Sequence, residues 1–597
     1  MKQLFLSGVA AIALAAPAFA QEASPSVDDA AAFLERAEAE LATDSEYAAR
    51  VFWIQANFIT HDTNWLASRV GSQSTQLSVR LANEAAQYDA LDLPDAMRRK
   101  IDILRSGITI PAPQDAAITD ELASITTGLD AAYSTGTFEM DGETLDLQQL
   151  SSIIETSRDP DVLRDVWEGW RTVSPPMAPH YARMVEIANA GAQELGFENL
   201  AEMWLSNYDM PPAEMQTEVE RLWGQVEPLY EQLHCHVRAE LNETYGDAVQ
   251  PAQGPIRADL LGNMWAQQWS NIYDLVGPEA SGPGFDLTET LNAQDYTPLR
   301  MVETGEDFFS SLGFDPLPET FWDRSLITQP EDRDVVCHAS AWNLDNVDDV
   351  RIKMCTEVNA EDFQTVHHEL GHNYYQRAYN QQDFLFRNGA HDGFHEAIGD
   401  FIALSITPDY LRELGLIEEV PPAEADIGLL MNQALDKIAF LPFGLMVDKW
   451  RWGVFRGETA PEDYNASWVA LREQYQGIVP PGDRPADAFD AGAKYHIPGN
   501  TPYLRYFLSF IMQFQFHEAA CEMAGWEGPL HRCSIYGNEE VGARFNAMME
   551  MGQSQPWPDA LEAFTGTREM DGSAIIAYFQ PLMAYLEEQN EGRTCGW

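Results

Sequence analysis

Apolar residues recur every three or four positions along most of the chain, which is the spacing of one face of an α-helix. The segment VDDAAAFLERAEAELATDSEYAARVFWIQANF, beginning at Val27, is typical. Few segments alternate apolar and polar residues as strands do, no fixed-period repeat is evident, and the Pro/Gly-rich breaks are too short to link independent domains. The pattern predicts one large, mainly α-helical body.

One region departs from this pattern. The segments DVVCHASAW and DVRIKMCTEV, which an Asn/Asp-rich turn separates, are the best strand candidates and together predict a β-hairpin. The chain that follows carries the signature of a helix start, with Asn359 as N-cap and Asp362 three positions later as in a capping box. We expect a helix from about residue 360 to residue 379.

That helix contains the stretch TVHHELGHNYYQ. His368 and His372 are four residues apart, so they share one face of the helix, as two ligands of a single zinc ion require. Glu369 points to the adjacent edge, where it could take a proton from a metal-bound water, as in a zinc peptidase. A polar helix face without a metal is the alternative.

A second predicted helix, in GAHDGFHEAIGDFIALS, offers a third ligand. Glu396 is the natural one, because a His-His-carboxylate set leaves the fourth position of zinc open for water. Asp400, four residues later, could orient a ligand imidazole. The other acids nearby are expected in caps and turns, and the other histidines in packing: Glu361, Asp362 and Asp392, and His367, His391 and His395.

A third segment, AGAKYHIPGNTPYLRYF, gathers cationic and aromatic residues. Lys494 and His496 alternate, as in an extended strand, and Thr501 with the proline after it predicts the start of a helix. Tyr503 and Tyr506 then lie at the N-terminal end of that helix, where the helix dipole and Lys494 both favour an anion. A peptide C-terminal carboxylate would fit there; an aromatic core helix with a solvated lysine is the alternative.

Charge and targeting signals narrow the setting. The net charge of −58 over 597 residues argues against nucleic acid and anionic membranes as partners. Residues 1–20, with an early lysine, an apolar run and a small-residue end, predict a signal peptide and an exported protein, periplasmic or secreted. No later run reaches about 18 apolar residues, so we expect no membrane anchor.

The chain has six cysteines, and export makes disulfide bonds possible. Two pairs are close in sequence and are the expected bridges: Cys337 with Cys355, and Cys521 with Cys533. Cys235 and Cys595 have no obvious partner. Asn242 and Asn465 match the N-glycosylation pattern, which is short enough to arise by chance.

Together HHELGH, GFHEAIGD, CHASAW, LLGNMWAQ, ALDKIAFLPF and AKYHIP…PYLRYF resemble the angiotensin-converting enzyme family of peptidyl-dipeptidases, over nearly the whole mature chain. The resemblance implies a large, two-lobed helical zinc peptidase with a deep central cleft and a small hairpin beside the metal-binding helix. It implies a single catalytic domain over residues 21–597, with two interleaved helical subdomains. The N-terminal helices, about residues 27–91, would form a lid that admits only short peptides.

The resemblance also implies the roles of individual residues. One zinc ion would be bound by three of them: His368, His372 and Glu396. Glu369 would activate the water and pass its proton to the leaving amine. His496 and Tyr506 would stabilise the oxyanion, at roughly 3 kcal/mol for each well-placed donor.

The same resemblance implies how a peptide would bind. Three residues would hold its C-terminal carboxylate, two residues beyond the cut: Gln267, Lys494 and Tyr503. Such a clamp acts as a ruler, so dipeptides would be released from short peptides with a free C-terminus. The substrate main chain would pair with the edge strand at His338, Ala339 and Ala341. Phe440 and Phe510 would line the pocket for the last side chain.

Chloride is implied as a second cofactor. The matching residues form two sets: Arg171, Trp468 and Arg472, and Tyr208 with Arg505. From residue types alone these arginines would be ordinary salt-bridge formers, but buried arginines need a counter-ion, which chloride can supply. The disulfides depart from the family pattern, since eukaryotic members have three bridges and only two local pairs match here.

Two other functions remain open. Another zinc peptidase, an endopeptidase or a single-residue carboxypeptidase, would share the metal site but lack the clamp, and would be insensitive to amidation of the substrate C-terminus. A catalytically silent peptide-binding homologue would show no turnover and no sensitivity to chelators.

Overall fold

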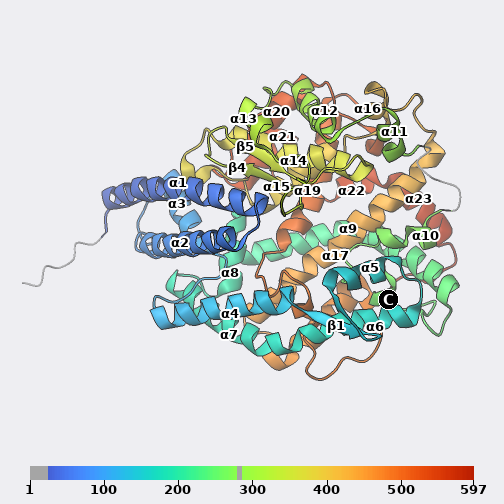
Figure 1. Cartoon of the computed structure of the whole chain (residues 1–597), viewed down its shortest axis with the longest axis horizontal. Coiled ribbons are helices and arrows are strands. Elements are labelled where there is room, and N and C mark those ends of the chain that lie inside the picture. The colour runs from blue at the N-terminus through green and yellow to red at the C-terminus, as the bar shows by residue number, and fades with distance from the viewer. Residues whose placement is uncertain (1–24, 279–284) are drawn as a thin grey trace, which may run out of the picture.

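A computed structural model describes residues 25–278 and 285–597 (Figure 1). The predicted signal peptide, residues 1–20, lies outside the described residues. Helices dominate, as the apolar spacing predicts, and the described strands form only two-stranded sheets. Within the described part of the chain, no helix has both the length and the apolar character that a membrane crossing requires.

The first nine helices are α1 Val27–Asn57, α2 His61–Ala86, α3 Asp95–Ser106, α4 Ala116–Ser134, α5 Leu147–Thr156, α6 Pro160–Trp170, α7 Ala178–Glu194, α8 Leu200–Leu205 and α9 Pro212–Tyr245. The central helices are α10 Tyr273–Val276, α11 Leu287–Ala293, α12 Pro298–Ser311, α13 Glu319–Arg324, α14 Ala360–Tyr379, α15 Asp392–Ala403, α16 Pro408–Glu413 and α17 Asp426–Phe455. The last are α18 Tyr464–Leu471, α19 Leu504–Met523, α20 Glu539–Met549, α21 Trp557–Thr565, α22 Ser573–Tyr578 and α23 Gln580–Gln589.

The strands are β1 Thr137–Met140, β2 Glu143–Asp146, β3 Ile256–Arg257, β4 Ser340–Asn343, β5 Val350–Lys353 and β6 Ile478–Val479. The predicted hairpin is β4 with β5, paired antiparallel with Ser340 opposite Lys353. It is shorter than the two apolar segments suggest. The β1–β2 hairpin and the parallel β3–β6 pair were not predicted, because such short strands leave no alternating pattern.

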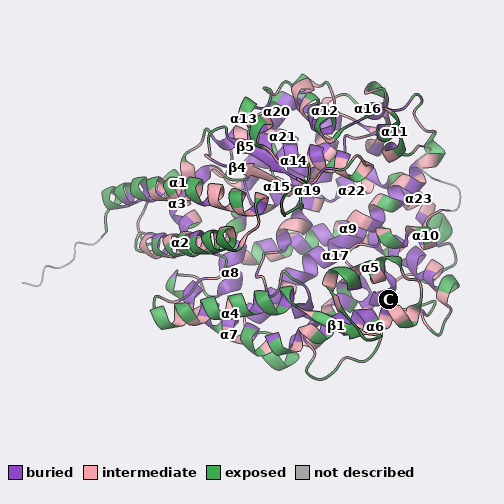
Figure 2. Cartoon of the chain, in the orientation of Figure 1, coloured by how far each residue is buried: buried purple, intermediate pink, exposed green. Residues whose placement is uncertain are grey.

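The long helices α9 and α17 run through the middle of the molecule, with α4 and α7 on one side and α12, α14 and α20 on the other in the view of Figure 1. Helix α17 is buried along most of its length (Figure 2). Buried apolar side chains from nearly all elements after α3 form one continuous cluster. One continuous core over this part of the chain agrees with the absence of long linkers.

Helices α1 to α3 have a small core of their own, to which Leu385 of the main body contributes. They attach beside the β4–β5 hairpin: the rings of Trp53 and Trp342 lie 5.4 Å apart, and the Val336 N–H donates to the Ala56 carbonyl at 2.8 Å. In Figure 1 they project from one end of the molecule. Their role as a lid stays a prediction.

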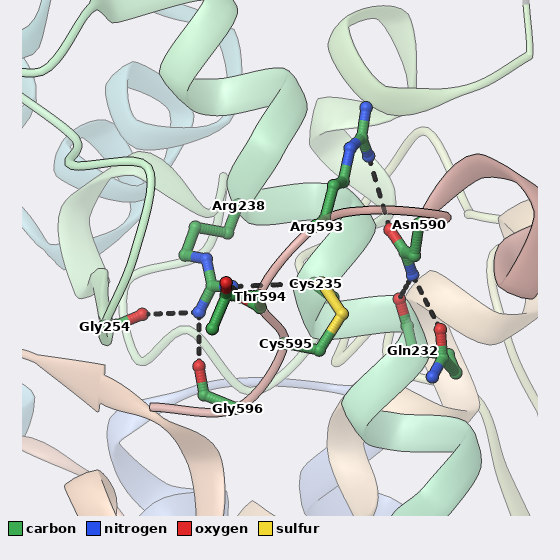
Figure 3. The surroundings of a disulfide bond; sticks show 9 residues. All are labelled: Gln232, Cys235, Arg238, Gly254, Asn590, Arg593, Thr594, Cys595 and Gly596. Carbon is green, nitrogen blue, oxygen red and sulfur yellow. Dashed lines mark hydrogen bonds between the residues drawn. A yellow bond between two sulfur atoms is a disulfide. The ribbon is translucent and has the colours of Figure 1, made fainter.

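The structure contains three disulfide bonds. Two of them are the predicted local pairs. The third joins Cys235 on α9 to Cys595, 360 residues away, and sequence spacing gave no indication of it (Figure 3). Arg238, one turn further along α9, donates to the carbonyls of Gly254, Thr594 and Gly596, so the C-terminal segment is held at two adjacent points.

We expect replacement of both Cys235 and Cys595 by serine to lower the free energy of unfolding by about 2–5 kcal/mol, because the bridge closes a long loop of the unfolded chain. The pair of serine substitutions at Cys521 and Cys533 is the control, since that bridge spans only 12 residues and should stabilise less. Denaturant unfolding of both variants measures the difference. A larger loss from the short bridge would contradict the loop argument.

Candidate metal centre and its surroundings

Helix α14 begins and ends where the sequence predicts. The Asn359 side chain accepts the Asp362 N–H at 2.7 Å, so Asn359 is the N-cap. The predicted capping box is wrong in its second bond. The Asp362 carboxylate accepts the N–H of Glu357 at 2.6 Å instead of that of Asn359. That bond ties the helix start to the turn that leaves β5.

Helices α14 and α15 pack closely because both carry glycine where they cross. A Cβ atom on Gly399 would lie 2.7 Å from Nδ1 of His368, and one on Gly371 would lie 3.1 Å from the Cα of Gly399. Larger residues at either position would push the helices apart. This close approach brings Glu396 of α15 to the two histidines of α14.

The predicted ligands do come together. The rings of His368 and His372 lie 4.7 Å apart and nearly perpendicular, and the ligand atoms of both with one oxygen of Glu396 all lie within 4.8 Å of one another. Nε2 of His368 is 3.6 Å from Oε2 of Glu396. Two imidazoles and a carboxylate are the donor set of catalytic zinc sites. All three side chains are partly accessible and line a cavity of about 940 Å³.

The charges around His368 also fit a cation. Burial opposes its protonation, yet the carboxylates of Asp400, Glu396 and Glu369 raise the pKa of His368 to about 9. The surroundings therefore favour positive charge at this position. The buried Nδ1 atom of His372 has no hydrogen-bond partner among the described residues.

Asp400 holds His368 from behind. Its Oδ1 lies 3.1 Å from Nδ1 of His368, which leaves Nε2 free for a metal. Its Oδ2 accepts from Lys437 at 3.4 Å and from Gln513 at 3.0 Å. Burial opposes ionisation, but Lys437 and His368 together lower the pKa of Asp400 below its usual range. Lys437 and Gln513 were missed, although Lys437 lies within the motif ALDKIAFLPF.

We expect Asp400→Asn to weaken zinc binding by about 10–100-fold, because an amide holds the imidazole with less charge and can present the wrong group to Nδ1. Competition with a chromogenic chelator measures the affinity. Asp436→Asn, a nearby α17 carboxylate that bonds Gln268 rather than a histidine, is the control. Equal zinc affinity in wild type and Asp400→Asn would contradict the role of Asp400.

Glu369 lies beside the ligands and is 7% exposed. Burial raises the pKa of its carboxyl to about 7, against the lowering effects of His368, Lys353 and the Ala341 backbone. Its Oε2 has no hydrogen-bond partner among the described residues. A carboxyl with a pKa near neutrality and an unoccupied oxygen is suited to receive and return a proton.

Strand β4 runs along the same cavity, which His338, Ala339 and Ala341 line together with the three predicted metal ligands. The buried Lys353 of β5 donates to the carbonyls of Val336 and His338 at 2.6 and 2.5 Å, and so fixes the segment that leads into β4. Lys353 was missed, because a lysine in a short strand carries no signal of burial.

The predicted carboxylate clamp is also assembled. Lys494 Nζ donates to Oε1 of Gln267 at 2.7 Å, and the Tyr503 hydroxyl donates to the same oxygen at 3.4 Å. The Lys494 ammonium lies 4.2 Å from the ring centre of Trp265, a residue that was missed. Burial lowers the pKa of Lys494 to about 7. Among the described residues no carboxylate is within ion-pair distance of Lys494, and a buried cation of this kind favours the arrival of an anion.

The backbone around this clamp differs from the prediction. Lys494 and His496 are not in an extended strand; a short 3₁₀ turn, Asp490–Ala493, leads into successive turns over 495–500. Thr501 does not cap α19, which begins at Leu504. The cap comes from α17 instead: the Asp448 carboxylate accepts the N–H groups of Tyr503 and Leu504 at 2.8 and 2.7 Å. A tertiary contact of this kind cannot be read from local sequence.

His496 and Tyr506 lie near each other, with ring centres 5.8 Å apart. Burial lowers the pKa of His496 to about 3, so its imidazole is neutral, and its Nδ1 has no partner among the described residues. Phe440 and Phe510 pack at 4.7 Å, and Lys437 lies 4.9 Å above the ring of Phe510. Lys437 also bonds Asp400, which contacts His368, so the two aromatic rings lie between the predicted metal ligands and the predicted clamp. The clamp residues themselves do not line the 940 Å³ cavity.

The first predicted anion set is buried. Arg472 and Trp468 line a cavity of about 10 Å³ with Trp167 and Asp490, a volume on the scale of one small ion or water. Arg171 lies against Trp167, its Cζ 3.4 Å from the ring centre. Nε of Arg171 and Nε1 of Trp167 have no hydrogen-bond partner among the described residues. Trp167 was missed as a member of this set.

The second predicted set contains an unforeseen residue. Arg505 Nε lies 3.2 Å from Oδ2 of Asp392, and the Tyr208 hydroxyl also interacts with that carboxylate. The assignment of Asp392 to a cap is wrong, because His391 caps α15 by accepting the Gly393 N–H at 3.0 Å.

The sequence of the chain is similar to that of known proteins over most of its length. Residues 24–597 match the sequence profile of the peptidase M2 family, angiotensin-converting enzyme. The chain is 42% identical over 562 residues to the angiotensin-converting enzyme of Bos taurus, which covers 93% of this chain and 43% of the cattle protein. The protein of that name from Haematobia irritans exigua is 40% identical over 571 residues, 93% of both chains. That from Theromyzon tessulatum is 45% identical over 74% of this chain and 72% of its own. This chain thus spans less than half the length of its mammalian relatives but most of the fly protein.

Proposed function

Because the chain belongs to the angiotensin-converting enzyme family, we propose that it is a zinc-dependent dipeptidyl carboxypeptidase that acts on short peptides with a free C-terminus. The observation that carries the proposal is the pairing of a His-His-Glu centre with a separate buried Lys494–Gln267–Tyr503 cluster. The His-His-Glu centre suits peptide hydrolysis in general, and the lysine cluster suits the binding of a substrate carboxylate.

Zinc on His368, His372 and Glu396 would supply a Lewis acid for the scissile carbonyl and for water. Glu369 takes the proton of the attacking water on its free Oε2 and returns it to the leaving amine. Its buried position keeps its pKa near the range in which both transfers are possible. Glu369 is thus proposed as the general base and then the general acid.

The oxyanion that forms during attack needs donors. The neutral His496 and the Tyr506 hydroxyl are proposed to supply them, at roughly 3 kcal/mol each when well placed. The carbonyl of His496 accepts from Arg451 at 2.9 Å, and Arg451 also bonds the Asp448 that caps α19. One ion pair thereby sets the positions of both proposed donors.

The peptide is proposed to lie along β4, where Ala339, Ala341 and His338 line the cavity wall. Its C-terminal carboxylate would meet Lys494, Gln267 and Tyr503, and its last side chain would pack on Phe440 and Phe510. Recognition through main chain and carboxylate gives a fixed cleavage length with little demand on sequence. The helices at residues 27–91 are proposed to restrict entry to short peptides.

Two further properties belong to the proposal. Arg171, Arg472 and Trp468 would hold chloride. Arg472 lines the small cavity, Arg171 lies against Trp167 at its wall, and neither arginine has a carboxylate ion pair among the described residues. Export, to a periplasm or to the medium, is supported by three disulfide bonds, which persist in oxidising compartments.

Mass spectrometry of a hexapeptide and its C-terminal amide, each incubated with the protein with and without a zinc chelator, tests the function. Successive loss of C-terminal dipeptides, sensitive to the chelator and largely abolished by amidation, is the expected result. Internal or single-residue cleavage would keep a zinc peptidase but discard the clamp. No cleavage by the zinc-loaded protein would favour the silent peptide-binding homologue.

A further inference from the structure

Arg505 is the residue before the proposed oxyanion donor Tyr506, in the first turn of α19. Its Nε lies 3.2 Å from Oδ2 of Asp392, the first residue of α15, and the two side chains are 31% and 30% exposed. Helices α15 and α19 pack against each other, and α15 also carries Glu396 (Figure 1). The ion pair therefore joins the helix of a metal ligand to the helix of Tyr506.

Tyr208 completes this group from a 3₁₀ turn, Ser206–Tyr208. Burial raises the pKa of Asp392, and the Arg505 guanidinium and the Tyr208 hydroxyl lower it. Burial opposes the charge of Arg505, but Asp392 raises the pKa of that guanidinium above its usual range. The Trp557 indole donates to the Tyr208 carbonyl at 2.6 Å, so the turn is fixed in place. Cation, carboxylate and hydroxyl thus form a group whose charges balance internally.

Among the described residues, no other acid lies within ion-pair distance of Arg505. Asp448 also influences Arg505, but its Oδ1 accepts from Arg451 at 2.7 Å and its Oδ2 accepts the N–H groups of Tyr503 and Leu504. Both of its oxygens are therefore engaged. Asp392 has its Oδ2 directed at Arg505.

The other arginine set differs in this respect. Arg171 donates to the carbonyls of Trp167 and Met264, and Arg472 donates to Gln476 and the Trp265 carbonyl. Among the described residues neither arginine has a carboxylate within ion-pair distance, and burial lowers the pKa of Arg472 to about 10. Asp490, which lines the cavity, is paired with Arg484. The direct acceptors of Arg171 and Arg472 are neutral, so an external anion can balance their buried charges.

We infer that the Asp392 carboxylate is the built-in counter-ion of Arg505, so that chloride binds at Arg171 and Arg472 but not at Arg505 and Tyr208. Chloride at the second set does not fit, because it would lie beside the Asp392 carboxylate, which is already 3.2 Å from Nε of Arg505 and would repel it. Asp392 is then a positioning residue: it holds the start of α19, and with it Tyr506, without any dissolved anion. The role for Tyr506 rests on the proposed function, whereas the number of anion sites does not.

Anomalous diffraction from crystals soaked in bromide, which replaces chloride and can be located directly, tests the inference. In the wild-type protein we expect one bromide, at Arg171 and Arg472, and none at Arg505. In Asp392→Asn, which keeps the shape and removes the charge, a second bromide should lie between Arg505 and Tyr208. Asp392→Glu keeps the charge and should show only the first. A wild-type bromide at Arg505, or none there in Asp392→Asn, would overturn the inference.

Kinetics give a second readout. All proteins compared also carry Arg472→Gln, which weakens anion binding at the Arg171–Arg472 set and so reduces its contribution to any effect of chloride. In that background the protein with Asp392 should respond little to chloride, while Asp392→Asn should lose roughly tenfold in kcat/KM in chloride-free buffer and regain most of it with added chloride. Anion rescue separates a charge effect from mere structural damage. A loss that chloride does not restore would contradict the positioning role.

If no variant cleaves peptides, the proposed function fails, and the bromide positions still decide the anion sites.

Discussion

Glu369→Gln should lower kcat by about 10²–10⁴-fold while zinc remains bound. Glutamine fills the same space but cannot accept the proton of the attacking water, nor return it to the leaving amine. The carboxyl is 7% exposed and has a pKa of about 7, so few other groups could take over. Single-turnover hydrolysis of a hexapeptide, with metal analysis of the same sample, measures both parts of the prediction.

The matched control for that variant is Glu361→Gln. Glu361 lies on the same helix and lines the same cavity, but it is exposed at the helix start and outside the group of metal ligands. We expect little change in kcat there. If Glu369→Gln turned over normally with zinc bound, another residue would be the base. If zinc were lost, the variant would report on metal binding rather than on proton transfer.

The grouping of the three predicted metal ligands is the part of this site that sequence predicts best, because these residues lie on two regular helices. A spacing of four residues in a helix fixes where His368 and His372 point, so no tertiary information is needed to place them on one face. The local cysteine pairs are likewise constrained by short spacing. Cys235 and Cys595 could not be paired in this way, because only the complete fold brings α9 to the C-terminal segment.

The clamp shows a different limit. Its predicted residues do lie together. The backbone that carries them was predicted as a strand followed by a locally capped helix, whereas the structure has turns and a cap from Asp448 on α17. Asp392 was misassigned for the same reason: its partner Arg505 lies on another helix. Local rules give the positions of residues within an element. Which buried charges neutralise one another is decided by packing between elements.

The largest expected effect on binding comes from Lys494. Lys494→Met should lower kcat/KM for a peptide with a free C-terminus on the order of 100-fold, because a buried charge-assisted contact to the carboxylate is lost. For the corresponding amide, which offers no negative charge, the same substitution should have little further effect. Steady-state kinetics on both peptides with both proteins form a double-mutant cycle, whose coupling isolates the contact between lysine and carboxylate.

Lys449→Met is the control, since Lys449 lies on α17 and pairs with Glu220. It should leave the ratio of the acid and amide rates unchanged. Product analysis adds a second criterion: without the clamp the cleavage register should loosen, so fragments other than dipeptides should appear. If Lys494→Met reduced cleavage of the acid and the amide equally, the lysine would be structural. The fixed product length would then have to come from Gln267 and Tyr503, or from the wall that β4 forms along the cavity.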